Sequence, residues 1–482
     1  QLSARFVIPI YDSIEDIFNA LKQMALIHKS GGGVGYSFSG IRPKGDIVST
    51  SKGISSGPVS FLEIFDKATD IIKQGGRRRG ANIAILEANH PDIIEFIESK
   101  KGNKLQNFNI SVAITDKFVN ALKRDGYYDL VNPKTRKTVK RMKAKSVFNK
   151  IVENAWAHGE PGVIFTDEVN RKNVLKLGRI ESTNPCSEVP LYPFESCNLG
   201  SINLCNMVDA ENNDVNWERL RRVVRLGVHF LDNVIDANRF PLPEIKRVTK
   251  ANRKIGIGVM GFAELLIKLG VAYDSDESVK LAEKVMKFVS KEARSKSIEL
   301  GRERGNFPNF KKSVFYRKYK YMRNATATAI APTGTISMIA NTSSGIEPLF
   351  AISFERIVMG KKRVFEVNRL FKENLKKEWL LNKKIVNHSS SIQKIKEIPK
   401  EIRRVFVTSL DIKPEWHLKV QAAFQKFTDN AISKTVNLPS NASRSDVKKV
   451  FMSAYDLKCK GVTVYRYGSI ENQVLNVCEE CK

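Results

Sequence analysis

The chain has 482 residues, of which 42% are hydrophobic and only 6 are cysteine. This composition predicts a globular protein with a sizeable core and excludes a disulfide-rich scaffold. The formal net charge is +29, but lysines are spread along nearly all helical stretches, which favours a solvated surface over a dedicated nucleic-acid site. No signal-peptide pattern and no apolar run of bilayer-spanning length occurs, so we expect a cytoplasmic protein with no membrane partner.

The first predicted elements are a strand and a helix. Residues 1–11 contain a short β-branched run that is typical of a strand. Asp12 or Ser13 then caps a helix whose apolar residues recur at helical spacing. Residues 31–46 are rich in glycine, which lets the backbone approach a ligand closely but is equally typical of a flexible turn.

Further along the chain, residues 74–81 place three arginines between glycines. Such a loop suits phosphate binding, with a solvated charge run as the alternative. Residues 132–145 predict a hairpin and residues 161–165 a buried strand. Residues 256–261 match the GxGxxG dinucleotide fingerprint, but the residues before them are basic and polar, so we reject a Rossmann fold.

The most informative stretch is residues 184–204. It places the thiol of Cys186 two residues from the amide of Asn184 and two from the carboxylate of Glu188. Pro185 disfavours a helix, so we expect an extended backbone that projects these three side chains from one face. A second thiol, Cys197, follows eleven residues after Cys186. An ordinary loop with two structural cysteines is the alternative.

Two later motifs also carry chemistry. Residues 331–337 read Ala-Pro-Thr-Gly-Thr-Ile-Ser, and such a turn lets successive N–H groups converge on an anion, although it also occurs without a ligand. Cys478 and Cys481 form a CxxC pair near the end of the chain. A redox role is favoured over zinc because no second CxxC exists, and we predict no metal site.

With these motifs, residues 1 to about 469 resemble the catalytic subunits of ribonucleotide reductases, most closely the adenosylcobalamin-dependent class II branch. The resemblance implies an α/β fold, a ten-stranded α/β barrel with the catalytic cysteine on a central finger loop. It divides the chain into a barrel domain, residues 1–470, and a C-terminal redox tail, residues 471–482.

The reaction implied is reduction of ribonucleotides, taken as diphosphates, to 2′-deoxyribonucleotides, with adenosylcobalamin as the radical source. Cys186 would become a thiyl radical, Glu188 would act as general base, Asn184 would orient the substrate, and Cys197 would be half of a reducing thiol pair. The substrate-binding positions would be Ser3, Ala4, Gly32, Gly33, Asn184, Thr333, Gly334, Thr335, Ile336 and Ser337.

The resemblance also implies regulation and partners. Deoxynucleotide or ATP effectors would bind at Asp12, Ser13, Ile14, Arg42 and Arg78. Cys478 and Cys481 would carry electrons from a thioredoxin-like reductant, and the protein would form a homodimer.

One position departs from the family pattern. The family's first barrel strand carries a cysteine, the usual partner of Cys197, where this chain has Arg5. Cys205 is the only nearby substitute in sequence, so we predict poor or absent reduction. Two alternatives stay open. The chain could be the large subunit of a two-subunit reductase, or a catalytically inactive relative that binds nucleotide or nucleic acid.

Overall fold

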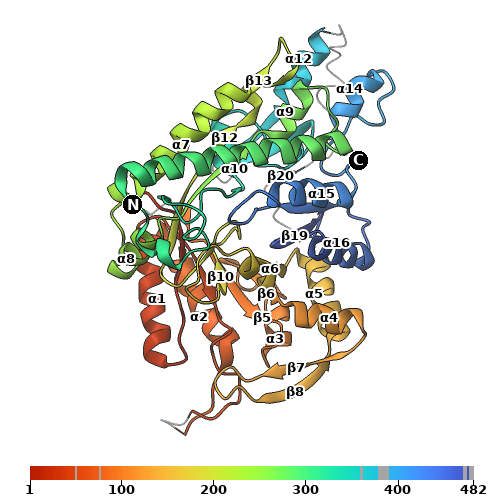
Figure 1. The fold of residues 1–482 in the computed structure, drawn as a ribbon. Helices are drawn as coiled ribbons and strands as arrows, with labels where there is room; N and C mark the ends of the chain where they lie inside the picture. Colours follow the sequence, from red (N-terminus) through yellow and green to blue (C-terminus); the bar gives the residue numbers. More distant parts are fainter. Residues whose placement is uncertain (49–51, 75–77, 359–361, 378–389, 470–474, 477–482) are drawn as a thin grey trace.

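The computed structural model describes residues 1–48, 52–74, 78–358, 362–377, 390–469 and 475–476. At its centre lies a nine-stranded sheet (Figure 1). In spatial order the strands are β15 (Ile255–Met260), β12 (Ser196–Asn203), β1 (Arg5–Val7), β2 (Gly33–Ser37), β5 (Asn82–Glu87), β6 (Phe108–Ile114), β9 (Gly162–Phe165), β19 (Gly461–Arg466) and β18 (Thr435–Leu438).

The strand directions define two edges of this sheet. The pairs β1–β12 and β9–β19 are antiparallel, and all other neighbouring pairs in the sheet are parallel. The starts of β1 and β2 therefore lie on the side toward which β12 and β15 run, but Arg5 pairs with Cys197 near the start of β12, so the ends of β12 and β15 project well beyond them. We call the side formed by the starts of β1 and β2 the Arg5 edge. The ends of β5, β6 and β9 and the starts of β18 and β19 lie at the opposite edge.

Helices supply the crossovers that parallel neighbours require, and Figure 1 shows them packed around the sheet. In chain order they are α1 (Ile14–Lys29), α2 (Gly57–Ile71), α3 (Ile93–Glu98), α4 (Asp116–Lys123), α5 (Ala144–His158), α6 (Thr166–Arg171), α7 (Trp217–Ala237), α8 (Pro243–Asn252), α9 (Phe262–Lys268), α10 (Asp276–Arg304), α11 (Gly334–Ile339), α12 (Arg369–Lys377), α14 (Lys400–Val405), α15 (Pro414–Gln425) and α16 (Arg444–Asp456). Short 3₁₀ turns form η1 (Leu204–Asn206) and η2 (Pro308–Lys312).

Smaller sheets of two or three strands accompany the central sheet. They comprise β3 (Lys73–Gln74) with β4 (Arg78–Arg79), β7 (Tyr127–Val131) with β8 (Thr138–Lys143), β10 (Ser182–Thr183) with β11 (Pro190–Leu191), β13 (Val208–Asp209) with β14 (Asp214–Val215), and β16 (Ser353–Val358) with β17 (Lys362–Val367) and β20 (Leu475–Asn476).

Most locally predicted elements are confirmed. Ser13 caps α1, because its hydroxyl accepts a hydrogen bond from the backbone N–H of Asp16 at 3.0 Å. The predicted buried strand appears as β9, whereas the hairpin predicted for residues 132–145 starts earlier, because its first strand is β7, before residue 132, and residues 144–145 belong to α5. The GxGxxG stretch lies in and just after β15, where a β-carbon on Gly258 would lie 2.1 Å from the carbonyl oxygen of Ala329. This glycine therefore permits close packing of two chain segments. Such a packing role agrees with the decision to reject a Rossmann fold.

The α/β class is confirmed, but the barrel prediction is met only in part. Within the described ranges, no continuous ladder closes the sheet into a ring. Two isolated parallel bridges lie between its ends. Ile257 of β15 pairs with Thr328, and Ile330 pairs with Ile432, shortly before β18. The segment around residues 328–330 thus lies beside β15 and runs in the same direction.

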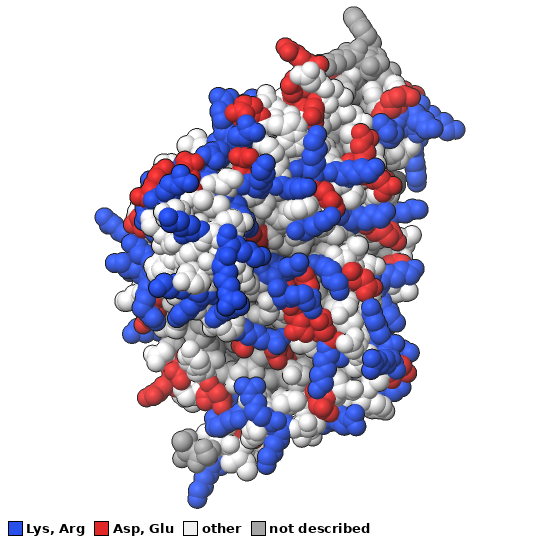
Figure 2. Space-filling view, viewed as in Figure 1, with Lys and Arg blue, Asp and Glu red and all other residues white. Residues whose placement is uncertain are grey.

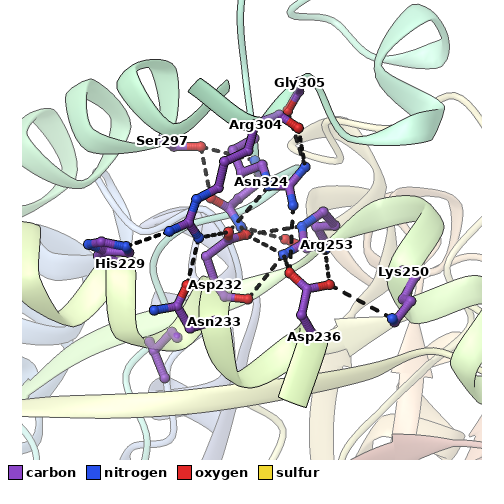
Figure 3. A network of polar contacts seen from close by, with 12 residues as sticks. His229, Asp232, Asn233, Asp236, Lys250, Arg253, Ser297, Arg304, Gly305 and Asn324 are labelled. Atoms are coloured by element: carbon purple, nitrogen blue, oxygen red, sulfur yellow. Dashed lines mark hydrogen bonds and ion pairs between the residues drawn. The ribbon is translucent and has the colours of Figure 1, made fainter. Parts of the chain in front are cut away.

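A buried polar network links α7 to the residues that precede β15 and the segment around residues 328–330 (Figure 3). The carboxylate of Asp232 is fully buried and accepts hydrogen bonds from Arg253 Nη2 at 2.7 Å and Asn324 Nδ2 at 3.1 Å. Arg323 adds an ion pair at 3.2 Å. Arg253 lies just before β15, and Asn324 lies shortly before the bridged segment around residues 328–330. The network therefore fixes where both segments begin.

The surface carries mixed charge. Figure 2 shows Lys and Arg over much of the visible face, with Asp and Glu interspersed among them. This agrees with the distributed lysines of the sequence. No helix in the described part of the chain combines the length and apolar character needed to cross a bilayer.

Candidate active site

Cys186 lies at the tip of a short hairpin formed by β10 and β11. The chain turns here, because the N–H of Ser187 donates to the carbonyl of Asn184 at 2.9 Å and Ser187 has φ of 65°. The predicted extended backbone is therefore wrong. The prolines exclude a helix but do not exclude a tight turn, and the turn reverses the chain at the tip.

Two glycines of β2 let the hairpin approach the sheet. A β-carbon on Gly35 would lie 1.7 Å from the carbonyl oxygen of Thr183, and one on Gly33 would lie 3.0 Å from the ring of Pro185. Asn109 of β6 donates to the carbonyl of Pro185 at 3.0 Å. These contacts pack the hairpin against β2 and β6 of the central sheet.

The turn brings Asn184 and Glu188 together. Asn184 Nδ2 donates to Glu188 Oε2 at 2.6 Å, and Asn184 Oδ1 accepts from the N–H of Val189 at 2.8 Å. Both side chains are fully buried. Because the amide oxygen is held by the backbone, the amide nitrogen points at the carboxylate, and the carboxylate has a fixed position.

Arg5 joins this pair from β1. Its Nε lies 3.0 Å from Glu188 Oε1, and Arg5 pairs in register with Cys197 across the antiparallel β1–β12 pair. Burial alone lowers the pKa of Arg5, but the charges of Glu188, Cys186 and Cys197 outweigh it and the pKa is raised. A permanent cation therefore faces the candidate base and both thiols of the site.

The second thiol has no partner cysteine among the described residues. Burial raises the pKa of the Cys197 thiol. Cys205 lies in η1, beyond the far end of β12. A strand rises about 3.3 Å per residue, so the strand from Cys197 to Asn203 alone covers about 20 Å. A disulfide requires Cα atoms within about 7 Å, so Cys205 cannot replace the missing thiol in this fold.

The predicted substrate residues of the N-terminal part lie at the Arg5 edge. The N–H of Gly33 donates to the carbonyl of Ala4 at 3.0 Å, which joins the starts of β1 and β2. Ser3 is buried and its hydroxyl accepts from Asn238 Nδ2 at 3.1 Å. Gly32 is also buried, and a β-carbon there would lie 2.5 Å from the ring of Phe6.

The predicted anion turn lies beyond the end of β15 and not at the starts of β1 and β2. The segment around Thr328 runs parallel to β15, so Thr333 follows at the end where β15 finishes. Thr333 adopts φ of 52°, and its hydroxyl accepts from the N–H of Gly345 at 2.8 Å. Ser337 is buried. In contrast, residues 334–336 (Gly334, Thr335 and Ile336) are exposed on α11.

A pocket lies on the other side of the hairpin, at the opposite edge, and Cys186 is part of its wall. It is partly open to solvent. Hydroxyl side chains dominate its polar lining. They are those of Ser111, Thr166, Ser182, Thr183, Ser187, Ser433, Thr435 and Thr463. Cys186 thus belongs to a hairpin that separates this pocket from Glu188 and Arg5.

A buried charged cluster beside this pocket was missed by the sequence reasoning. Lys434 Nζ forms an ion pair with Glu347 and lies 2.9 Å from His417 Nδ1. Burial lowers the pKa of Lys434, and the charge of Glu347 opposes this effect. Residue spacing gave no signal for the cluster, because its members lie on separate segments that meet only in the folded chain.

The predicted effector residues fall into two groups. Asp12 and Arg42 meet, with Arg42 Nε 2.8 Å from Asp12 Oδ2, and Ser13 and the exposed Ile14 lie beside them at the start of α1. Arg78 lies in β4, opposite Gln74, and its side chain falls outside the described residues. Cys478 and Cys481 fall outside them entirely. The described residues contain no cluster of His, Cys, Asp or Glu suited to a metal ion.

Comparison with known proteins agrees with this geometry. The family described as "Ribonucleotide reductase, barrel domain" matches residues 3–465. A vitamin B12-dependent ribonucleoside-diphosphate reductase from Thermoplasma acidophilum is 52% identical over 481 residues, 98% of this chain and 62% of that protein. A protein of the same name from Mycobacterium tuberculosis is 47% identical over 98% of this chain and 69% of its own length.

A solved structure gives the same fold. The class Id ribonucleotide reductase alpha subunit of Actinobacillus ureae matches with a TM-score of 0.80 at 22% identity, over 97% of this chain and 84% of that chain. The fold and the hairpin site therefore define a ribonucleotide reductase barrel. The chain belongs to the ribonucleotide reductase barrel-domain family, and it spans 62% of the length of the Thermoplasma relative.

Proposed function

We propose that this chain is the catalytic barrel of a ribonucleoside-diphosphate reductase that acts through a thiyl radical on Cys186. The observation that carries the proposal is the position of Cys186. It lies at the tip of a buried hairpin, between a pocket on one side and the Asn184–Glu188 pair with the Arg5 edge on the other. A radical on this thiol would be held beside the sugar.

The proposed roles follow from the geometry at the tip. Cys186 Sγ would take the hydrogen atom from C3′ of the ribose. Glu188 would accept the 3′-hydroxyl proton, since its carboxylate is held in place by Asn184. Ser3, Ala4 and Gly33 would line the sugar, and the turn at Thr333 would bind the diphosphate through backbone N–H groups. Loss of the 2′-hydroxyl then needs two electrons from a thiol pair that includes Cys197.

The residues around the pocket fit the adenosyl part of adenosylcobalamin. Serine and threonine hydroxyls of the pocket lining can pair with ribose hydroxyls and adenine nitrogens beside Cys186. When bound, the cofactor supplies the one-electron chemistry that no amino-acid side chain provides unaided. The names of the Thermoplasma and Mycobacterium relatives support this branch over the two-subunit type.

We extend the proposal to the rest of the chain. Residues 1–470 would form the barrel domain, with the bridged segment around residues 328–330 as its tenth strand. Residues 471–482 would form the redox tail. Cys478 and Cys481 would transfer electrons from a thioredoxin-like reductant to the active-site thiols. Deoxynucleotides or ATP would bind near the Asp12–Arg42 pair in a cytoplasmic homodimer.

A second candidate function rests on Arg5. An arginine can neither donate an electron nor close a disulfide with Cys197, so the chain as written would bind nucleotide and reduce it poorly or not at all. The test is turnover of a ribonucleoside diphosphate with adenosylcobalamin and a small dithiol. Arg5→Cys should raise deoxynucleotide formation strongly over the unmodified chain. If Arg5→Cys forms no deoxynucleotide but binds the diphosphate tightly, a nucleotide-binding relative is the better assignment.

A further inference from the structure

Arg5 does more than replace a thiol, because it also contacts the candidate base. Glu188 is fully buried and both of its oxygens are engaged, Oε1 by Arg5 Nε at 3.0 Å and Oε2 by Asn184 Nδ2 at 2.6 Å. The backbone carbonyl of Glu188 is also held, by the N–H of Ala431 at 2.8 Å. The carboxylate therefore cannot move away from the arginine without disturbing the hairpin.

The position of Arg5 is fixed equally firmly. Its backbone is hydrogen-bonded between β12 and β2, opposite Cys197 on one side and Gly33 on the other. Its side chain remains 28% exposed, so part of it reaches solvent. Arginine stays protonated throughout the accessible pH range. The cation at this position is therefore permanent.

We propose that Arg5 captures Glu188 and so removes the general base from use, independently of the missing thiol. This inference rests on the proposed function. Because Arg5 already occupies Glu188 Oε1 and Asn184 occupies Oε2, a substrate hydroxyl would have to displace one of these contacts to reach the carboxylate. The chain then carries two separable defects, one in proton acceptance and one in electron supply.

Three substitutions at one position separate the two defects. Arg5→Ser removes the cation without adding a redox thiol, and its side chain has nearly the shape of cysteine. Arg5→Cys removes the cation and supplies the thiol. Arg5→Lys keeps a cation at the same place and is the matched control.

The pair itself is tested first, without cofactor or turnover. Thermal unfolding is measured for the unmodified chain, Arg5→Ser, Glu188→Gln and the double variant. Either single change leaves the other group without its charged partner, so each should lower the melting temperature. The double variant should lose less than the sum of the two single losses. Strict additivity would overturn the capture, because it would mean that the two side chains do not interact.

The consequence is tested with a 3′-tritiated ribonucleoside diphosphate and adenosylcobalamin, without any reductant. Cys186 Sγ takes tritium from C3′ and leaves a carbon radical there, while Glu188 takes the 3′-hydroxyl proton. The S–³H group then exchanges with water. We expect Arg5→Ser and Arg5→Cys to release tritium at least tenfold faster than the unmodified chain, and Arg5→Lys to stay at the unmodified level.

The outcomes distinguish the two proposals. With a dithiol added, only Arg5→Cys should form deoxynucleotide. If Arg5→Cys is active and Arg5→Ser releases no more tritium than the unmodified chain, the capture is overturned and the missing thiol alone explains the loss. If Arg5→Cys releases no tritium either, the proposed reductase function is overturned, together with any catalytic consequence of the ion pair.

Discussion

Arg5 and Cys197 lie directly opposite each other in the antiparallel pair of β1 and β12. Facing Cα atoms in such a pair are about 4.5–5.5 Å apart, which is within the range that a disulfide spans. The resemblance placed a cysteine at position 5 from sequence motifs alone. The register gives that placement a physical basis, because a thiol there would meet Cys197.

The first prediction uses this register. Arg5→Cys should form a disulfide with Cys197 on mild oxidation, in the absence of any substrate. Peptide mapping by mass spectrometry under non-reducing conditions would detect the cross-link. Arg5→Cys combined with Cys197→Ser is the matched control and should lack it. A cross-link to Cys205 instead would contradict the register.

The second prediction concerns the radical thiol. In the Arg5→Cys background, Cys186→Ser should abolish deoxynucleotide formation while calorimetry finds nucleotide binding within about twofold of the parent. An oxygen-centred radical at this site is far harder to generate than a thiyl radical. Retained product formation in the serine variant would exclude Cys186 as the radical site.

The third prediction concerns thiol reactivity. Cys186 is partly exposed, whereas Cys197 is fully buried and burial raises its pKa. Because alkylation requires the thiolate, iodoacetamide should label Cys186 well before Cys197 at neutral pH. A raised pKa means that the Cys197 thiolate becomes populated only as the pH rises, so its labelling should accelerate in alkaline buffer. Equal rates at neutral pH would mean that the hairpin opens readily.

The fourth prediction concerns the network of Figure 3. Asp232→Ala should lower the free energy of unfolding by about 3 kcal/mol, because it leaves the buried Arg253 with only part of its counter-charge. Urea denaturation would measure the loss. Asp236→Ala is the control, since Asp236 contacts the same arginine but is 47% exposed. Its loss should stay below about 1 kcal/mol, and an equal loss in both variants would contradict the role of burial.

The fifth prediction concerns regulation. Arg78→Ala in the Arg5→Cys background should change which substrate base is preferred, and should change the maximal rate less. Turnover of four ribonucleoside diphosphates, each with each deoxynucleotide effector, would measure this. The neighbouring Arg79→Ala serves as control. An unaltered preference in Arg78→Ala would remove the effector role from this loop.

The sequence by itself determined the elements whose signals are local. The apolar spacing and the cap at Ser13 predicted α1, and the residues before GxGxxG were enough to reject a dinucleotide site. The motif around Cys186 indicated the chemistry. In each case the information lies within a few residues along the chain, where backbone sterics and side-chain periodicity act directly.

Only the tertiary structure decided how the site is assembled. Proline spacing suggested an extended stretch at residues 184–188, but glycines of β2 admit a buried hairpin there and the chain turns at its tip. The pairing of Arg5 with Glu188 joins residues 183 positions apart, and the Lys434–Glu347 pair joins residues 87 positions apart. Such contacts depend on strand register and on which segments pack together. Those are properties of the whole fold, and no local pattern encodes them.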